Sequence, residues 1–128
     1  MGRTATPVAL IVEVDPELRQ LASTLLAESA LDVIACESAE AALSVMQRRD
    51  GIVLVFAGVQ LPGLIDGVDL ARLVDLHWPD TKVIVTGDAD DCVDHLPRDA
   101  AYVPKPWRAL DVLIAAEPVL PGPGLRGQ

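Results

Sequence analysis

Polar residues with distinct chemistry follow several of the apolar segments of this chain. A Glu-Val-Asp stretch at 13–15 comes directly after the first apolar segment, Thr86 follows a later one, and Lys105 follows the last. Carboxylate oxygens are ligands that Mg²⁺ prefers, while hydroxyl and ammonium groups donate hydrogen bonds to anions. These residue types form a binding site only if the fold brings the ends of the segments together.

Five short apolar runs predict the β-strands that would do this. The runs at 8–12, 52–56 and 83–85 are continuous, and those at 33–35 and 101–103 are weaker. Short continuous apolar runs are typical of strands that are buried on both faces, as in a parallel sheet.

Helical periodicity separates these runs and returns near the C-terminus. The periodic residues are Leu18, Leu21, Ala22, Leu25 and Leu26, then Ala39, Ala42, Leu43 and Met46, then Leu70, Leu73 and Val74, and finally Leu110, Leu113 and Ile114. Ser38 and Asp66 are expected to cap two of the helices, and the last helix is expected to start near Pro106. The residues between Thr86 and Ala100 have little periodicity, which predicts a loop or a single turn.

Alternating strands and helices predict an α/β domain with right-handed crossovers and an open parallel sheet. In such sheets, ligands bind beyond the carboxyl ends of the strands, so the polar residues described above are expected to share one edge. Residues 1–6 and the Pro/Gly-rich segment 118–128 are expected to be flexible. A single domain is therefore predicted at 7–117.

Four features occur together in an order and spacing that resemble bacterial response-regulator receiver domains, over about residues 8–116. They are Leu61-Pro62-Gly63, Thr86, Tyr102 and Lys105-Pro106-Trp107. The resemblance implies a flavodoxin-like, doubly wound sheet of five parallel strands in the order 2-1-3-4-5, within three α/β/α layers. The family's fourth helix would fall between residues 86 and 100, and here it is expected to be short or absent.

The resemblance also implies site roles, and two of the positions depart from them. The family's phospho-accepting aspartate falls at Gly58, and its main metal-ligating carboxylate falls at Val14. A glycine can neither attack a phosphoryl group nor bind a metal through a side chain, and Mg²⁺ usually takes one or two carboxylates directly. We therefore expect no working phospho-acceptor, no metal site, absent or very weak Mg²⁺ binding and no other cofactor.

The remaining site positions are expected to find new roles. Asp15 precedes Pro16, a pattern that favours a helix N-cap over a metal ligand. In the family Lys105 contacts the acceptor or its phosphoryl group, and Thr86 and Tyr102 form a switch pair. Because an unpaired buried ammonium group is costly, we expect Lys105 to contact Glu13 instead. Without an acceptor, the other two are expected to be an ordinary strand-end threonine and a half-buried tyrosine.

Composition limits the classes of function. The net charge of −9 argues against non-specific nucleic-acid binding, which relies on clustered Lys and Arg. No apolar run approaches the ~20 residues that cross a bilayer, and the N-terminus does not resemble a secretory signal, so the protein is expected to be cytoplasmic. Cys36 and Cys92 match no metal or redox spacing and are expected to be reduced thiols.

The leading hypothesis is a stand-alone receiver-like domain of two-component signalling that acts by protein contact without phosphorylation. Its expected partner is a sensor histidine kinase or another response regulator, and a homodimer is a further alternative. Binding to nucleic acid or to a membrane is not expected. The first and last helices, or residues 110–120, are the favoured contact surface. The alternatives are phosphorylation of another carboxylate, such as Asp88, Asp66 or Asp15, and a small molecule bound above Gly58. We expect no enzyme, because the sequence has no nucleophile–base pair and no Gly-rich phosphate loop.

Overall fold

The computed structural model describes residues 6–121, and its centre is one parallel sheet. The strands are β1 (Val8–Val12), β2 (Asp32–Cys36), β3 (Ile52–Gly58), β4 (Lys82–Gly87) and β5 (Ala101–Pro104). They lie in the order β2-β1-β3-β4-β5, and every neighbouring pair is parallel. The predicted fold class is confirmed, and each apolar run of the sequence lies within a strand.

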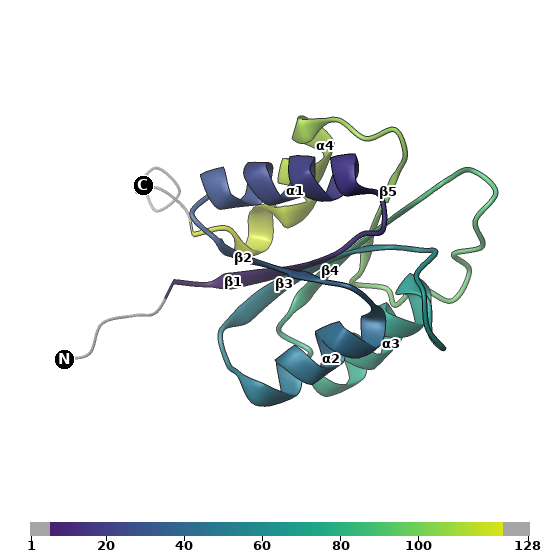
Figure 1. Ribbon diagram of the computed structural model, residues 1–128, viewed down its shortest axis with the longest axis horizontal. Helices are drawn as coiled ribbons and strands as arrows, with labels where there is room; N and C mark the ends of the chain where they lie inside the picture. The colour runs from purple at the N-terminus through teal and green to yellow at the C-terminus, as the bar shows by residue number, and fades with distance from the viewer. Residues whose placement is uncertain (1–5, 122–128) are drawn as a thin grey trace.

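Helices cover both faces of the sheet, because each connection between parallel strands must cross from one end of the sheet to the other. They are α1 (Pro16–Glu28), α2 (Ala39–Arg48), α3 (Gly67–His77) and α4 (Ala109–Ala116), followed by a 3-10 turn, η1 (Glu117–Val119). Figure 1 shows α1 and α4 on one face and α2 and α3 on the other. Each pair packs on its own hydrophobic cluster, with the apolar side chains of the sheet divided between them.

The helix starts follow the expected capping chemistry in three cases. The carboxylate of Asp15 accepts hydrogen bonds from the first turn of α1, and the Ser38 hydroxyl accepts one from Ala41 of α2. Asp66 and Asp69 form a reciprocal capping box at α3. Each bond satisfies a backbone N–H that would otherwise lack a partner.

The start and the buried face of α4 differ from the prediction. The helix begins at Ala109 rather than near Pro106, and the Arg108 backbone N–H donates to Asp111 at 2.9 Å. Residues 105–107 stay outside the helix. Trp107 lies in the core, where its indole meets Phe56 edge to face. The buried side chains of α4 are Val112 and Ala116, whereas two residues that marked the helix in the sequence, Leu110 and Ile114, are exposed.

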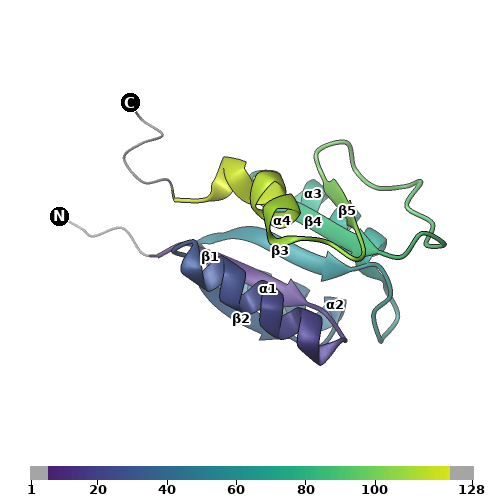
Figure 2. The ribbon, with the colours of Figure 1, turned by 90° about the horizontal axis from the view of Figure 1, so that it is seen from above.

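Between β4 and β5 the chain forms turns without a helix, as expected. Figure 2 shows this segment, residues 88–100, as a wide loop between the two strands. Within the C-terminal segment that was expected to be flexible, Val119 and Leu120 pack against the core. The remaining parts of the predicted flexible ends, 1–5 and 122–128, lie outside the described residues. No helix within residues 6–121 is long and apolar enough to cross a membrane.

Candidate functional site

The carboxyl ends of four strands meet at one edge of the sheet and bring the predicted site residues together. Gly58 at the end of β3 is in register with Thr86 of β4. The backbone N–H of Lys105, directly after β5, donates to the Gly87 carbonyl at 2.8 Å. Glu13 follows β1, the other neighbour of β3. Strand order and register therefore place residues from distant parts of the sequence side by side.

The Glu13 carboxylate lies at the centre of this edge. The residue is 3% exposed, its Oε2 accepts a hydrogen bond from the Asp15 backbone N–H at 3.0 Å, and its Oε1 is 3.5 Å from Lys105 Nζ. The Lys105 side chain keeps 24% exposure, so its ammonium group reaches both the carboxylate and solvent. The predicted contact between Glu13 and Lys105 is confirmed.

Glu13 also borders the space above Gly58, which one of the alternatives assigned to a small molecule. A Cβ added at Gly58 would lie 3.3 Å from Glu13 Oε1, which is tighter than an ordinary van der Waals contact. The residue at position 58 therefore meets a carboxylate oxygen rather than an open apolar cavity. Unit charges ~4 Å apart attract by about 4 kcal/mol gross at an effective dielectric of 20, before desolvation is subtracted. Lys105 thus offsets the cost of burying the Glu13 charge.

The other two residues of the 13–15 stretch, Val14 and Asp15, do not contribute to the buried site. Val14 is 52% exposed and presents only hydrocarbon. Asp15 is exposed, and its Oδ1 accepts from the backbone N–H groups of Glu17 and Leu18 at 2.8 and 3.2 Å, which confirms the N-cap interpretation. Of the three residues, only Glu13 contributes a buried carboxylate to the site.

Thr86 and Tyr102 lie on adjacent strands at the same edge. Thr86 is fully buried, and its hydroxyl has no hydrogen-bond partner among the described residues. The Tyr102 hydroxyl instead donates to the Asp88 carbonyl at 3.2 Å. Desolvation, followed by the negative charges of Asp91 and Asp88, raises the pKa of Tyr102, so the phenol remains a protonated donor at neutral pH. Tyr102 therefore fastens the start of the 88–100 loop to β5.

Asp91 fastens the same loop from the other side, and our sequence reasoning missed it. Its two carboxylate oxygens accept from the Gln60 side chain and from the Asp88 backbone N–H, each at 2.7 Å. Gln60 and Asp91 are 31 residues apart, so no local sequence pattern predicts the contact between them. The only signal was that Gln60 lies two residues beyond Gly58, in the loop after β3.

Glu40 is a second residue that the sequence did not single out. Its Oε2 accepts the Leu64 backbone N–H at 2.7 Å and thereby ties the start of α2 to the loop between β3 and α3. This backbone hydrogen bond is the main reason why the pKa of Glu40 is lowered. Gly63 has a φ of +101°, and a Cβ there would collide with the Glu40 carboxylate. The positive φ therefore favours glycine at 63, and a larger residue would also displace the Glu40 carboxylate from its contact with Leu64.

Comparisons with known proteins agree with this architecture. The model of the family described as the response regulator receiver domain matches residues 9–116. The response regulator protein FleR of Pseudomonas aeruginosa is 36% identical over 108 residues, which cover 81% of this chain and 22% of FleR. This chain therefore corresponds to about a fifth of the length of that relative.

Solved structures show the same fold. The signal receiver domain of an HD domain-containing protein from Pseudomonas fluorescens superposes with a TM-score of 0.79 at 25% identity, covering 92% of this chain and 89% of that one. The response regulator TrrA from Thermotoga maritima, solved in complex with Mg²⁺-BeF, gives a TM-score of 0.77 at 23% identity, with 89% and 99% covered. On the family match over most of its length, the chain belongs to the response regulator receiver domain family.

Proposed function

We propose that this chain is a pseudo-receiver module of two-component signalling, which acts by protein contact without being phosphorylated. Its partner would be a sensor histidine kinase or another response regulator, in line with the family to which the chain belongs. The observation that carries the proposal is the Glu13–Lys105 ion pair beside Gly58. Lys105 would otherwise be available to a phosphorylated side chain, and here it already faces a resident carboxylate.

The chemistry at position 58 supports this mechanism. Covalent phosphorylation needs a side-chain nucleophile whose oxygen attacks the phosphorus atom, and Gly58 has no side chain. The nearest carboxylate is that of Glu13, whose Oε2 accepts from the Asp15 backbone N–H and whose Oε1 faces the Lys105 ammonium group at 3.5 Å. An incoming phosphoryl group would have to displace Lys105 from Glu13 and would still find no acceptor at 58.

The donor set also supports the proposal that Mg²⁺ binds very weakly or not at all. Mg²⁺ demands near-octahedral oxygen ligation and usually one or two direct carboxylates. Gly58 and Val14 supply none, and the Asp15 carboxylate caps α1. Within residues 6–121, no three His, Cys, Asp or Glu side chains gather in a way that could hold a metal ion. The residues present do not fit the metal that the family implies.

Intact mass spectrometry tests the proposal directly. The protein is incubated with Mg²⁺ and acetyl phosphate beside a receiver domain that retains its acceptor aspartate. The expected result is a phosphoryl adduct on the control protein and none on this chain. An adduct on this chain would refute the mechanism, and mapping it to Asp88 would establish the alternative of a non-standard acceptor.

A titration with Mg²⁺ provides a second, independent measurement. The Trp107 indole lies in the core two residues beyond Lys105, so a cation that displaced Lys105 from Glu13 should change its fluorescence. A Trp78→Phe background removes the signal of the other tryptophan. The expected titration is flat through millimolar Mg²⁺. A saturable change would contradict the proposed lack of metal binding.

A further inference from the structure

One crossover of the sheet has no helix, and its absence leaves one side of α3 uncovered. The connections from β1 to β2, β2 to β3 and β3 to β4 each contain a helix, whereas residues 88–100 between β4 and β5 form only turns. Half-buried Val93 and Leu96 of this loop pack against the core. The loop therefore seals the sheet but does not supply a second helix beside α3.

The uncovered side of α3 forms one wall of a groove. Asp69, Arg72, Leu73 and Leu76 have the spacing of a single helical face, and all four line a hollow of about 610 Å³. Its opposite wall includes His95 and Pro97 of the loop. Leu76 is 71% exposed, so a large apolar side chain here has no cover within the described part of the chain.

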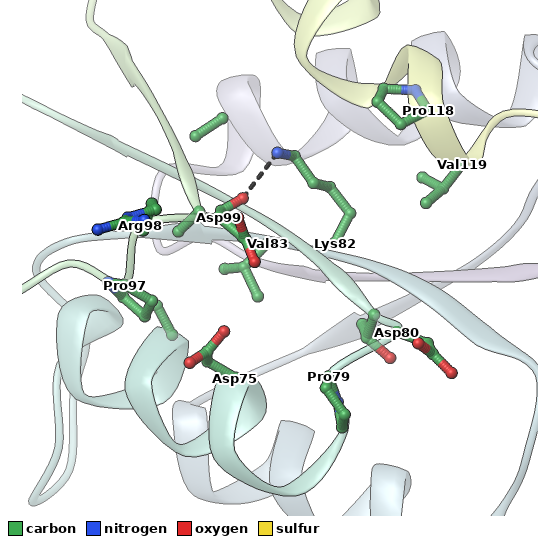
Figure 3. A pocket seen from close by; sticks show the side chains of 14 residues that line it. Asp75, Pro79, Asp80, Lys82, Val83, Pro97, Arg98, Asp99, Pro118 and Val119 are labelled. Carbon is green, nitrogen blue, oxygen red and sulfur yellow. Dashed lines mark hydrogen bonds between the residues drawn. The ribbon is translucent and has the colours of Figure 1, made fainter.

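A second hollow adjoins the first and leads from α3 across the amino ends of β4 and β5 to η1. It has a volume of about 620 Å³ and shares Asp75 and Pro97 with the first. Figure 3 shows Asp75 projecting from the helix beside Pro97, with Pro79 and Asp80 farther along the same wall. The first hollow follows α3 from Asp69 to Leu76, which is ~10 Å at 1.5 Å per residue. A groove of this length matches about two turns of another helix.

The charge around the groove selects the kind of helix that would fit. Between residues 64 and 100 there are nine aspartates against three Lys or Arg residues, so this segment carries six of the chain's nine net negative charges. Asp69 and Asp75 line the groove itself, beside one cation, Arg72. An apolar floor with an acidic border is complementary to an amphipathic helix whose apolar stripe is flanked by Lys and Arg.

We infer that the groove along α3 binds a basic amphipathic helix of a partner protein, which takes the place that the missing crossover helix leaves open. Apolar side chains at i, i+3, i+4 and i+7 of the partner would lie on Leu73 and Leu76, as in other complexes where a helix occupies a groove. Its cations would face Asp69 and Asp75. The inference rests on the proposed function, because it requires that this protein acts by protein contact. It adds which surface of this protein is used and what chemistry the partner has.

Fluorescence anisotropy with a defined probe tests the groove. The probe is a labelled helical peptide of leucine and lysine, about 18 residues long, whose leucines form one stripe. The matched variants are Leu76→Glu in the groove and Ile114→Glu on α4, the contact surface favoured from the sequence, which alter side chains that are 71% and 63% exposed. Saturable binding is expected, about tenfold weaker or worse with Leu76→Glu and unchanged within about twofold with Ile114→Glu. Added salt should weaken it.

Four results would overturn the inference. The first is no saturable binding, and the second is equal loss in both variants. The third is equal binding of a peptide with the same composition but no leucine stripe, or with glutamate in place of lysine. The fourth is a dimer of the protein alone, detected by sedimentation, that Leu76→Glu dissociates. Such a dimer would assign the groove to a second copy of this chain. A phosphoryl adduct in the mass experiment would refute the proposed function without changing the peptide result, so the two failures are distinguishable.

Discussion

At the scale of single residues, the length of the Glu13 side chain determines the state of the site. From the end of β1, the carboxylate reaches Lys105 with one oxygen and the Asp15 backbone N–H with the other. The same reach brings Oε1 to 3.3 Å from the Cβ position of residue 58. Glycine at 58 is therefore compatible with Glu13 in its observed position, and a larger residue there would crowd it.

Gly58→Asp is expected to lower stability at pH 7. The new carboxylate would lie against Glu13 Oε1, and a single lysine would have to balance two buried negative charges. We expect a loss of about 1–2 kcal/mol in the free energy of unfolding, measured by urea denaturation. Gly58→Asn, which has nearly the same size without the charge, should lose less. An aspartate variant as stable as the parent would show that the pocket tolerates the second charge.

Restoring the acceptor alone is not expected to restore phosphorylation. Gly58→Asp supplies a nucleophile but leaves Val14, which has no oxygen to offer Mg²⁺. The Val14→Asp/Gly58→Asp double variant adds the second carboxylate at a position that is 52% exposed and open to a cation. Intact mass after acetyl phosphate treatment should therefore show an adduct on the double variant only. Efficient phosphorylation of the single variant would mean that position 14 is dispensable.

At the scale of elements, sequence patterns predicted the positions of strands and helix starts that depend on neighbouring residues. Apolar runs located all five strands, and cap residues located the starts of α1, α2 and α3. The start of α4 was misplaced by three residues, because Pro106 suits a first helical turn while Trp107 is taken into the core instead. The loop contacts of Asp91 and Glu40 were not predictable, because their partners lie 31 and 24 residues away and no spacing connects them.

Glu40 is expected to make the attachment of α2 to the β3–α3 loop pH-dependent. Its pKa is lowered from the ordinary 4.5 mainly by the Leu64 backbone hydrogen bond, so the folded state favours the carboxylate. The resulting stability is present above the ordinary value and is lost as the pH falls through the lowered one. Glu40→Gln should therefore reduce the thermal midpoint at pH 7 and reduce it less near pH 3.

The matched control for this experiment is Glu37→Gln. Glu37 is exposed and lies three residues earlier in the chain, in the turn before α2. Its substitution should leave the midpoint nearly unchanged at both pH values. If Glu40→Gln costs as much near pH 3 as at pH 7, the contribution of Glu40 does not come from its ionised form.

At the scale of the whole molecule, the sheet separates two hydrophobic clusters, which we expect to unfold as one cooperative unit. Leu54 and Val55 are neighbours on β3, are both fully buried and belong to different clusters. Leu54→Ala should cost about 2–5 kcal/mol, and Val55→Ala should also destabilise. Both variants should unfold in one transition by near- and far-ultraviolet circular dichroism. Separate transitions would mean that the two layers unfold independently.

The ion pair at the edge of the sheet also changes what an approaching partner encounters at a distance. A lone ammonium group projects a field that falls off slowly, whereas opposite charges 3.5 Å apart act as a small dipole whose potential decays faster. At physiological ionic strength, screening sets in within ~8 Å. The long-range attraction of this end of the molecule is therefore dominated by the aspartates of the 88–100 loop. A partner would be oriented first by that acidic loop and would recognise the strand ends only at contact, by their shape.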